Sequence, residues 1–243
     1  MRAVWAGVLL GLAAFGSAAV PQALWINEIP HADALALEPV VEDFESLANQ
    51  RFDRPFRIKG ADVSQMLAGQ TLRYRTGRGG DRHWVLDARA PQVPLALDQT
   101  PGESFAAVVR DEAFAGRQAL AGIGPPQVAG RARLGSGIVT VLFDEPQCLF
   151  GLRTALDGGQ ENTVMRDQPE GNLNLIFWRR DGDKIGEFRR FTDQGLVELA
   201  YIQSSGGEAQ ILAVTIQNLD PGGIGIDEIL FSPLCPMMVS DLR

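Results

Sequence analysis

The chain has 243 residues, and its 22 basic and 30 acidic side chains give a net charge of −8 at pH 7. A chain this acidic is repelled by phosphates, which argues against binding to nucleic acid or to an anionic membrane. The length is typical of one large or two small domains, and β-sandwiches of this size often fold as a single domain.

The first 19 residues have the three-part pattern of a secretory signal peptide. Arg2 is positive, an apolar run extends from Ala3 to Phe15, and small residues lead up to Ala19. The apolar run is shorter than the roughly 20 residues that a membrane-spanning helix needs. We therefore expect cleavage after Ala19 and a periplasmic or extracellular protein, with an uncleaved membrane anchor as the alternative.

Short apolar runs separated by Gly, Pro, Asp and Asn dominate the rest of the chain, which is the pattern of an all-β protein. We expect residues 20–39 to form an N-terminal extension lying on the body, and residues 40–243 to form one β-sandwich domain. In the first half, Val40–Leu47 predicts a strand, whereas Gly122–Gly130 predicts a loop because Pro125 and Pro126 lack amide donors. The strands expected in the second half are Gly137–Phe143, Leu149–Arg153, Leu173–Arg179, Lys184–Phe191, Leu196–Ile202, Ala209–Gln217 and Ile226–Phe231.

Two local patterns refine this architecture. Asp181-Gly182 predicts a β-hairpin, because glycine tolerates the positive φ of a two-residue turn. Strands such as Ala209–Gln217 are apolar on both faces, which predicts a position in the middle of a sheet or under an additional layer. We therefore expect an antiparallel two-sheet β-sandwich with a few short helical turns, because this arrangement buries one face of each sheet against the other.

The chain has two cysteines, Cys148 and Cys235. An even number of cysteines in an exported protein predicts a disulfide bond. The alternative is a catalytic thiol, which needs a nearby histidine, and His31 and His83 are the only two histidines in the sequence. Neither histidine stands in a recognisable catalytic motif, so we favour the disulfide.

An acidic pair, Asp227 and Glu228, stands in the last predicted strand. Neighbouring residues of a strand face opposite sides, so one of the two carboxylates begins on the inward face. A buried carboxylate is costly unless it is paired, hydrogen-bonded or bound to a metal.

The acids near the two ends of the expected domain also suggest a family. The segment "DFE" (residues 43–45), together with "GIDEILF" (residues 225–231), resembles the secreted bacterial jelly-roll β-sandwiches of the carbohydrate-binding modules. In that family the first and last strands lie side by side and often hold a structural calcium ion. The resemblance implies a jelly-roll fold, with Glu45, Asp227 and the carbonyl of Asp43 as calcium ligands.

This sequence departs from the family pattern in two respects. The second acid of the last strand is Glu228, and no residue matches the family's middle ligand. Calcium takes about six to eight oxygen ligands, to which two carboxylates and backbone carbonyls would contribute part. The alternative is that Asp227 accepts backbone amides in a turn and that Glu45 is solvated.

Two aromatic residues are candidates for stacking on sugar rings. In their predicted strands, Trp178 and Tyr201 face the side opposite to some of the expected core residues, which allows either to be exposed. The alternative is that each fills the core, as aromatic side chains usually do.

Taken together, these patterns predict an exported, noncatalytic binding module for carbohydrate or cell-envelope matrix, with a structural calcium ion. The chain has no Gly-x-Ser-x-Gly or His-Glu-x-x-His motif, so no catalytic residue is assigned. Two other functions stay open: a polysaccharide hydrolase or lyase that uses paired carboxylates, and a structural envelope protein without a small ligand.

Overall fold

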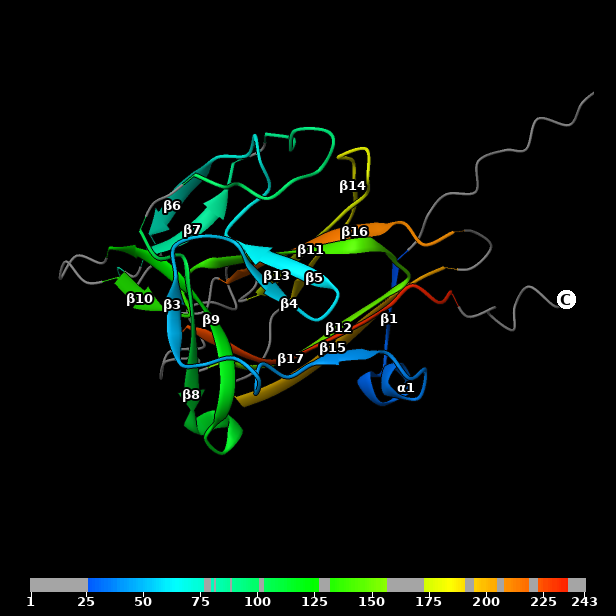
Figure 1. Ribbon diagram of the computed structural model, residues 1–243, viewed down its shortest axis with the longest axis horizontal. Helices are drawn as coiled ribbons and strands as arrows, with labels where there is room; N and C mark the ends of the chain where they lie inside the picture. The colour runs from blue at the N-terminus through cyan, green and yellow to red at the C-terminus, as the bar shows by residue number, and fades with distance from the viewer. Residues whose placement is uncertain are drawn as a thin grey trace, which may run out of the picture.

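The computed structural model describes residues 26–76, 80, 82–87, 89–100, 103–126, 132–156, 173–190, 195–204, 208–218 and 223–235. The predicted signal peptide, residues 1–19, lies outside these residues. Within the described ranges the chain forms two antiparallel sheets that face each other as a sandwich, together with a separate β-hairpin (Figure 1).

The described strands divide between these sheets as follows. The nine-stranded sheet contains β1 (Ile26–Ile29), β2 (Val40–Glu42), β3 (Gln50–Phe52), β8 (Ala106–Asp111), β9 (Arg117–Pro126), β10 (Ala132–Leu134), β12 (Leu149–Leu156), β15 (Gly195–Gln203) and β17 (Ile224–Ser232). The six-stranded sheet contains β4 (Phe56–Ile58), β5 (Ala61–Ser64), β11 (Ile138–Gln147), β13 (Leu173–Trp178), β14 (Lys184–Arg190) and β16 (Ile211–Asn218). The separate hairpin pairs β6 (Leu72–Thr76) with β7 (Arg82–Leu86), and the short helices are α1 (His31–Leu35) and η1 (Glu112–Phe114).

The structure confirms the predicted all-β antiparallel sandwich and each strand expected in the second half of the chain. The predicted hairpin is β13–β14, in which Gly182 has a φ of 82°. A Cβ atom at Gly182 would also lie 2.9 Å from Cγ2 of Val93, so glycine is required both for the turn and for this close approach. The jelly-roll connectivity stays a prediction.

The main core lies between the two sheets and is rich in aromatic rings. Phe143 and Phe177 from the six-stranded sheet meet Phe150 and Tyr201 from the nine-stranded sheet. The ring centroids of Phe177 lie 5.7 Å from Phe150 and 5.5 Å from Tyr201, in edge-on arrangements that aromatic pairs favour. These contacts fix how the two sheets stack.

Additional layers cover the outer faces of both sheets, which explains why several strands are apolar on both faces. On the nine-stranded sheet, Ala34 of α1 packs against Leu149, Ala200 and Leu230. On the six-stranded sheet, Leu67 and Leu97, which flank the β6–β7 hairpin in the chain, pack with residues of β13 and β16. The part of the predicted extension that the structure describes also contributes β1, which pairs with β15 at the sheet edge.

Two predictions in the first half of the chain are wrong in their boundaries. The strand expected over Val40–Leu47 ends at Glu42, because Phe44 adopts a left-handed backbone with a φ of 58°. The expected loop beginning at Gly122 instead continues β9 as far as Pro126. This path brings the backbone of Ile123 against Gly137. A Cβ atom at position 137 would lie 2.5 Å from the backbone nitrogen of Ile123, so the close approach requires glycine there.

Candidate functional site: an arginine-lined groove

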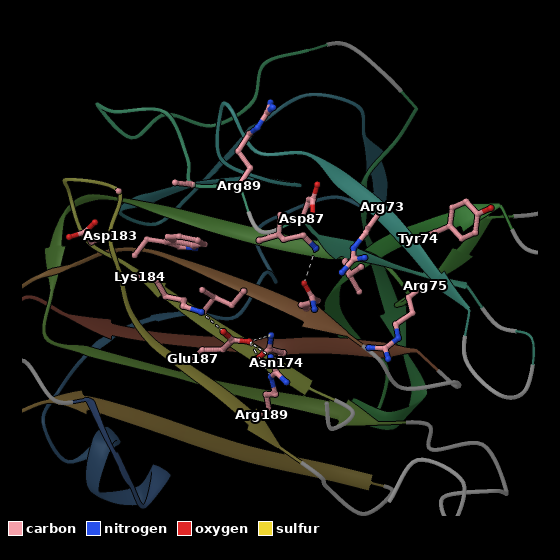
Figure 2. A pocket seen from close by; sticks show the side chains of 17 residues that line it. Arg73, Tyr74, Arg75, Asp87, Arg89, Asn174, Asp183, Lys184, Glu187 and Arg189 are labelled. Carbon is pink, nitrogen blue, oxygen red and sulfur yellow. Dashed lines mark hydrogen bonds and ion pairs between the residues drawn. The ribbon is translucent and has the colours of Figure 1, made fainter. Parts of the chain in front are cut away.

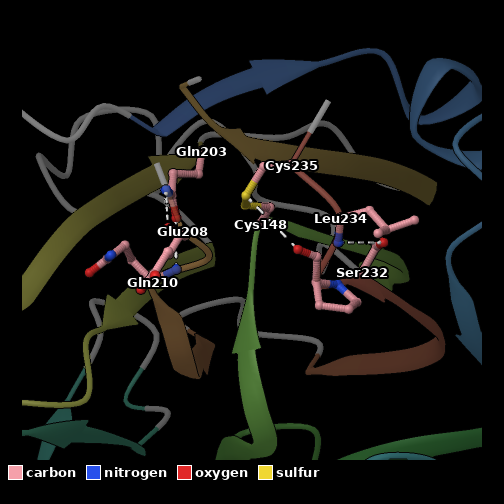
Figure 3. The surroundings of a disulfide bond; sticks show 8 residues. Cys148, Gln203, Glu208, Gln210, Ser232, Leu234 and Cys235 are labelled. Atoms are coloured by element: carbon pink, nitrogen blue, oxygen red, sulfur yellow. Dashed lines mark hydrogen bonds between the residues drawn. A yellow bond between two sulfur atoms is a disulfide. The ribbon is translucent and has the colours of Figure 1, made fainter. Parts of the chain in front are cut away.

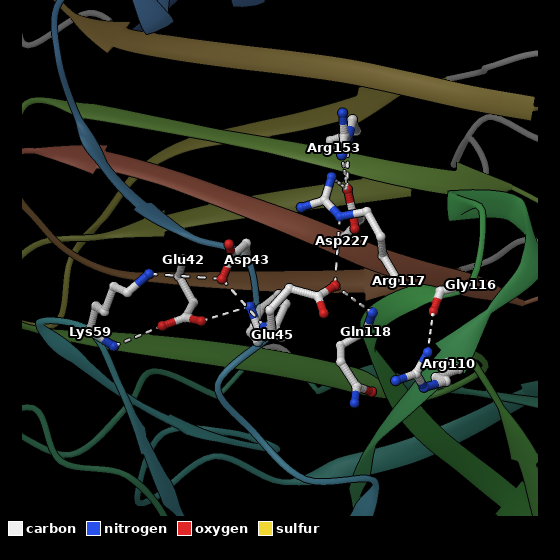
Figure 4. A network of polar contacts seen from close by, with 11 residues as sticks. Glu42, Asp43, Glu45, Lys59, Arg110, Gly116, Arg117, Gln118, Arg153 and Asp227 are labelled. Carbon is white, nitrogen blue, oxygen red and sulfur yellow. Dashed lines mark hydrogen bonds and ion pairs between the residues drawn. The ribbon is translucent and has the colours of Figure 1, made fainter.

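The structure brings together acids from both ends of the described chain. β2 pairs with β17 so that Val41 lies opposite Leu230, which confirms that the first strand of the predicted domain and its last strand are neighbours. Asp227 is fully buried, and Arg117 lies between it and Glu45, with Nη1 3.3 Å from Asp227 Oδ2 and Nε 3.6 Å from Glu45 Oε1 (Figure 4). The two predicted ligands therefore meet through a guanidinium group.

A second arginine completes the environment of Asp227. Arg153 of β12 donates from Nε to Asp227 Oδ2 at 2.7 Å, and its terminal nitrogen also contacts this oxygen. Burial disfavours the charged form of Arg153, but the hydrogen bond and the negative charge of Asp227 outweigh it and raise the pKa of the guanidinium. The two arginines thus provide the partner that a buried carboxylate needs at Oδ2, whereas Oδ1 is buried without a hydrogen-bond donor among the described residues.

The carboxylate of Asp43 accepts the backbone amide of Glu45 at 3.3 Å, whereas Glu42, which the sequence reasoning missed, is the buried acid of β2. The side chain of Asp43 is 38% exposed and lies 3.8 Å from Lys59 Nζ. Glu42 is 1% exposed and accepts the backbone amides of Phe44 at 2.7 Å and Lys59 at 3.0 Å. The hydrogen bond from Phe44 folds the chain back and accounts for the end of β2.

This donor set does not fit a calcium ion. A dication at Asp227 would face the positive charges of Arg117 and Arg153, which already contact its Oδ2. No group of three or more His, Cys, Asp or Glu side chains with metal-binding geometry occurs among the described residues. The calcium ion stays a prediction of the family resemblance, and no mechanism is built on it.

The two aromatic residues that were candidates for sugar stacking are both buried, as the alternative of packing into the interior requires. Tyr201 is fully buried in the core, where burial raises the pKa of its hydroxyl and Arg190 donates to its oxygen at 3.4 Å. Trp178 does face away from the main core, but Leu67 and Leu97 pack in the same cluster and leave it 7% exposed. Its indole nitrogen donates to Thr215 Oγ1 at 3.1 Å.

The structure confirms the predicted disulfide between Cys148 and Cys235 (Figure 3). The two Cα atoms lie 5.2 Å apart, a separation that suits a disulfide. The bond attaches the segment after β17 to the start of β12, where the amide of Cys148 also donates to the carbonyl of Ser232 at 2.8 Å. It therefore holds the last described strand in register, and neither sulfur is a free nucleophile.

The outer face of the six-stranded sheet carries the candidate functional site, a groove of about 670 Å³ beneath the β6–β7 hairpin (Figure 2). Its floor consists of outward-facing side chains of β13, β14 and β16, and its wall is formed by β6, β7 and the segment that follows β7. Register places Asn174 opposite Arg189 and Gln217, so these three polar side chains meet on the floor. Gln217 Oε1 accepts the amide of Leu86 at 3.0 Å and so fixes the hairpin to the sheet.

An ion-pair network stiffens the groove floor. Glu187 accepts hydrogen bonds from Lys184, from Arg189 at 2.9 Å and from Asn174 Nδ2 at 3.1 Å. Burial opposes its ionisation, but these donors outweigh that effect and lower the pKa of Glu187 to about 2. The amide oxygen of Asn174 is buried and has no donor among the described residues, so the floor offers an unused acceptor.

The groove wall carries two arginines on one face of a strand. Arg73 and Arg75 stand two residues apart on β6, opposite Val85 and His83, which are both buried. Because a cross-strand pair shares a face, both arginines point toward the sandwich, as Figure 2 shows. Tyr74, between them in the strand, also lines the groove; it is exposed, and Arg82 stacks over its ring at 4.9 Å.

The groove was missed at the sequence level, although one signal was present. The alternation "RYR" at residues 73–75 places two positive charges on one face if the segment forms a strand. The floor residues come from strands about 100 or more residues later, and their position against this hairpin depends on tertiary packing.

Two further findings concern membrane spans and known proteins. No helix among the described residues combines the length and apolarity needed to cross a membrane. A search of known protein families, curated proteins and solved structures finds nothing that matches this chain.

Proposed function

We propose that this protein is an exported, noncatalytic module that binds carbohydrate in the groove between the β6–β7 hairpin and the six-stranded sheet. The observation that carries the proposal is the polar lining of this groove. A volume of about 670 Å³ lies in the range of ligand sites, which is roughly 300–1,000 Å³. Export rests on the signal peptide predicted from residues 1–19.

The chemistry of the floor suits hydroxyl-rich ligands. The unused amide oxygen of Asn174 can accept a hydrogen bond from a sugar hydroxyl, and the neighbouring guanidinium of Arg189 can donate to ring and hydroxyl oxygens. The network around Glu187 holds these side chains in place before a ligand arrives, which lowers the entropic cost of binding.

The enzymatic alternative has less support. A glycosidase needs a general acid whose pKa is raised so that it stays protonated near neutral pH. Glu187, the acid at the centre of the floor, has its pKa lowered to about 2. It therefore stays ionised and paired with Lys184 and Arg189, and serves to orient the cations.

A groove-blocking variant tests the proposal. Ala90 lines the groove and is exposed, so Ala90→Trp introduces a bulky side chain at the site without removing a charge. Ala96→Trp, an exposed alanine outside the lining, is the matched control. We expect retention of the wild type and of Ala96→Trp, but not of Ala90→Trp, on at least one polysaccharide of a glycan panel. Equal retention of all three proteins, or retention of none, contradicts the proposal.

A further inference from the structure

We infer that the groove selects acidic polysaccharides, whose sugars carry carboxylate or sulfate groups. This inference rests on the proposed carbohydrate function and names the class of ligand. The groove is lined by five basic side chains, Arg73, Arg75, Arg89, Lys184 and Arg189, and by three acidic ones, Asp87, Asp183 and Glu187. A local excess of positive charge in a chain of net charge −8 is the observation to be explained.

The acids of the groove are largely committed to other partners. Glu187 is shared by Lys184 and Arg189, and Asp183 pairs with Arg179 at 2.7 Å. By contrast, neither Arg73 nor Arg89 forms an ion pair or hydrogen bond with another described residue. These two guanidinium groups are therefore available to a ligand.

Guanidinium groups match the geometry of the proposed ligand. Arginine binds carboxylate and sulfate-like groups through two parallel N–H donors, which gives direction as well as charge. Arg73 and Arg75 stand about 6.6 Å apart along β6, from the rise of a β-strand. A row of cations above a polar floor suits a chain with repeated negative charges better than one small anion.

The same features disfavour a single-stranded nucleic acid, the other common polyanion. Proteins that bind single strands stack the bases on exposed aromatic side chains. In this groove Trp178 is covered, and Tyr74, the exposed aromatic of the lining, already stacks its ring with Arg82. The described groove residues thus supply mainly charge and hydrogen bonds, and their one exposed aromatic ring is already stacked with an arginine rather than free for a row of bases.

The test compares charged and neutral forms of the same polymer. Polygalacturonate is paired with its fully methyl-esterified form, and dextran sulfate with dextran, in affinity electrophoresis and isothermal titration. The double variant Arg73→Gln/Arg89→Gln removes the two available cations. Arg51→Gln/Arg54→Gln, at two exposed arginines outside the groove, is the control with the same change in net charge.

We expect the wild type and the control to bind at least one acidic polymer about tenfold or more tightly than its neutral form, and the groove variant to lose that preference. Equal binding of charged and neutral polymers overturns the inference but leaves the proposed function standing. Binding of no polymer at all overturns the proposed function. Equal competition by free galacturonate or sulfate identifies a small-anion site, and tighter binding of oligodeoxythymidylate identifies a nucleic-acid site; either result overturns the inference.

Discussion

The buried carboxylate of Asp227 provides a quantitative test of what stabilises the sandwich. Asp227→Asn keeps the shape of the side chain but removes its charge, so Arg117 and Arg153 lose the carboxylate that they share. Removing one partner of a buried ion pair costs about 3–5 kcal/mol. Arg153 is 24% and Arg117 38% exposed, so water can partly compensate, and we expect about 3 kcal/mol.

The effect is measured by urea unfolding followed by tryptophan fluorescence, and by calorimetry. For a domain of this size, about 3 kcal/mol corresponds to a fall in Tm of roughly 6–12 °C. Asp43→Asn is the matched control, because Asp43 is half-exposed and should change stability by less than about 0.5 kcal/mol. If both variants unfold alike, the ion pairs of Asp227 with Arg117 and Arg153 do not stabilise the sandwich as proposed.

Three other perturbations have defined outcomes. Reducing the Cys148–Cys235 bond, which spans 87 residues, should lower the free energy of unfolding by about 4–5 kcal/mol, measured by urea unfolding with and without reductant; no change would show that the bond does not constrain the unfolded chain. Because the pKa of Glu187 is lowered to about 2, its ion pairs stabilise the fold above about pH 4.5 and are lost as the pH falls toward 2. Glu187→Gln should therefore be less stable than wild type by about 1 kcal/mol at pH 6 and by less at pH 3; a constant difference would contradict the shift. Since Arg117 and Arg153 already supply positive charge at Asp227, a chelator should leave Tm unchanged, whereas a fall in Tm would support the calcium ion.

The late strands were predictable because local pattern and tertiary structure agree there. The apolar runs that form β11 to β17 lie between turn residues, and Gly182 supplies the positive φ that its hairpin requires. Their double-sided hydrophobicity also indicated the outer layers, although not that α1 and the segments flanking the β6–β7 hairpin provide them.

The early elements were harder to predict because side-chain hydrogen bonds and close packing decide them. Glu42 accepts the amide of Phe44 and ends β2, an interaction that strand propensity does not contain. The continuation of β9 through Ile123 depends on close packing against Gly137, which no local signal identifies. The sequence did indicate that Asp227 needs a partner, but the choice between a metal ion and two arginines depends on Arg117 and Arg153, which are remote in the chain.

The groove could not be predicted from the sequence for a related reason. Its floor and wall belong to segments about 100 residues apart, and the ion pairs of Glu187 are formed within a hairpin whose outward face only the fold defines. The two aromatic residues that were candidates for sugar binding pack in the interior instead. Tyr201 fills the core, and Trp178 packs against the segments that flank the hairpin.

The most direct test of the groove as the binding site is an NMR titration of the isotope-labelled protein with a polygalacturonate oligomer. We predict that amide shifts concentrate on β6, β13 and β14 and include Arg73, Asn174 and Arg189. Shifts that cluster elsewhere, for example around the separate cavity lined by Val109, Leu156 and Leu196, would contradict it.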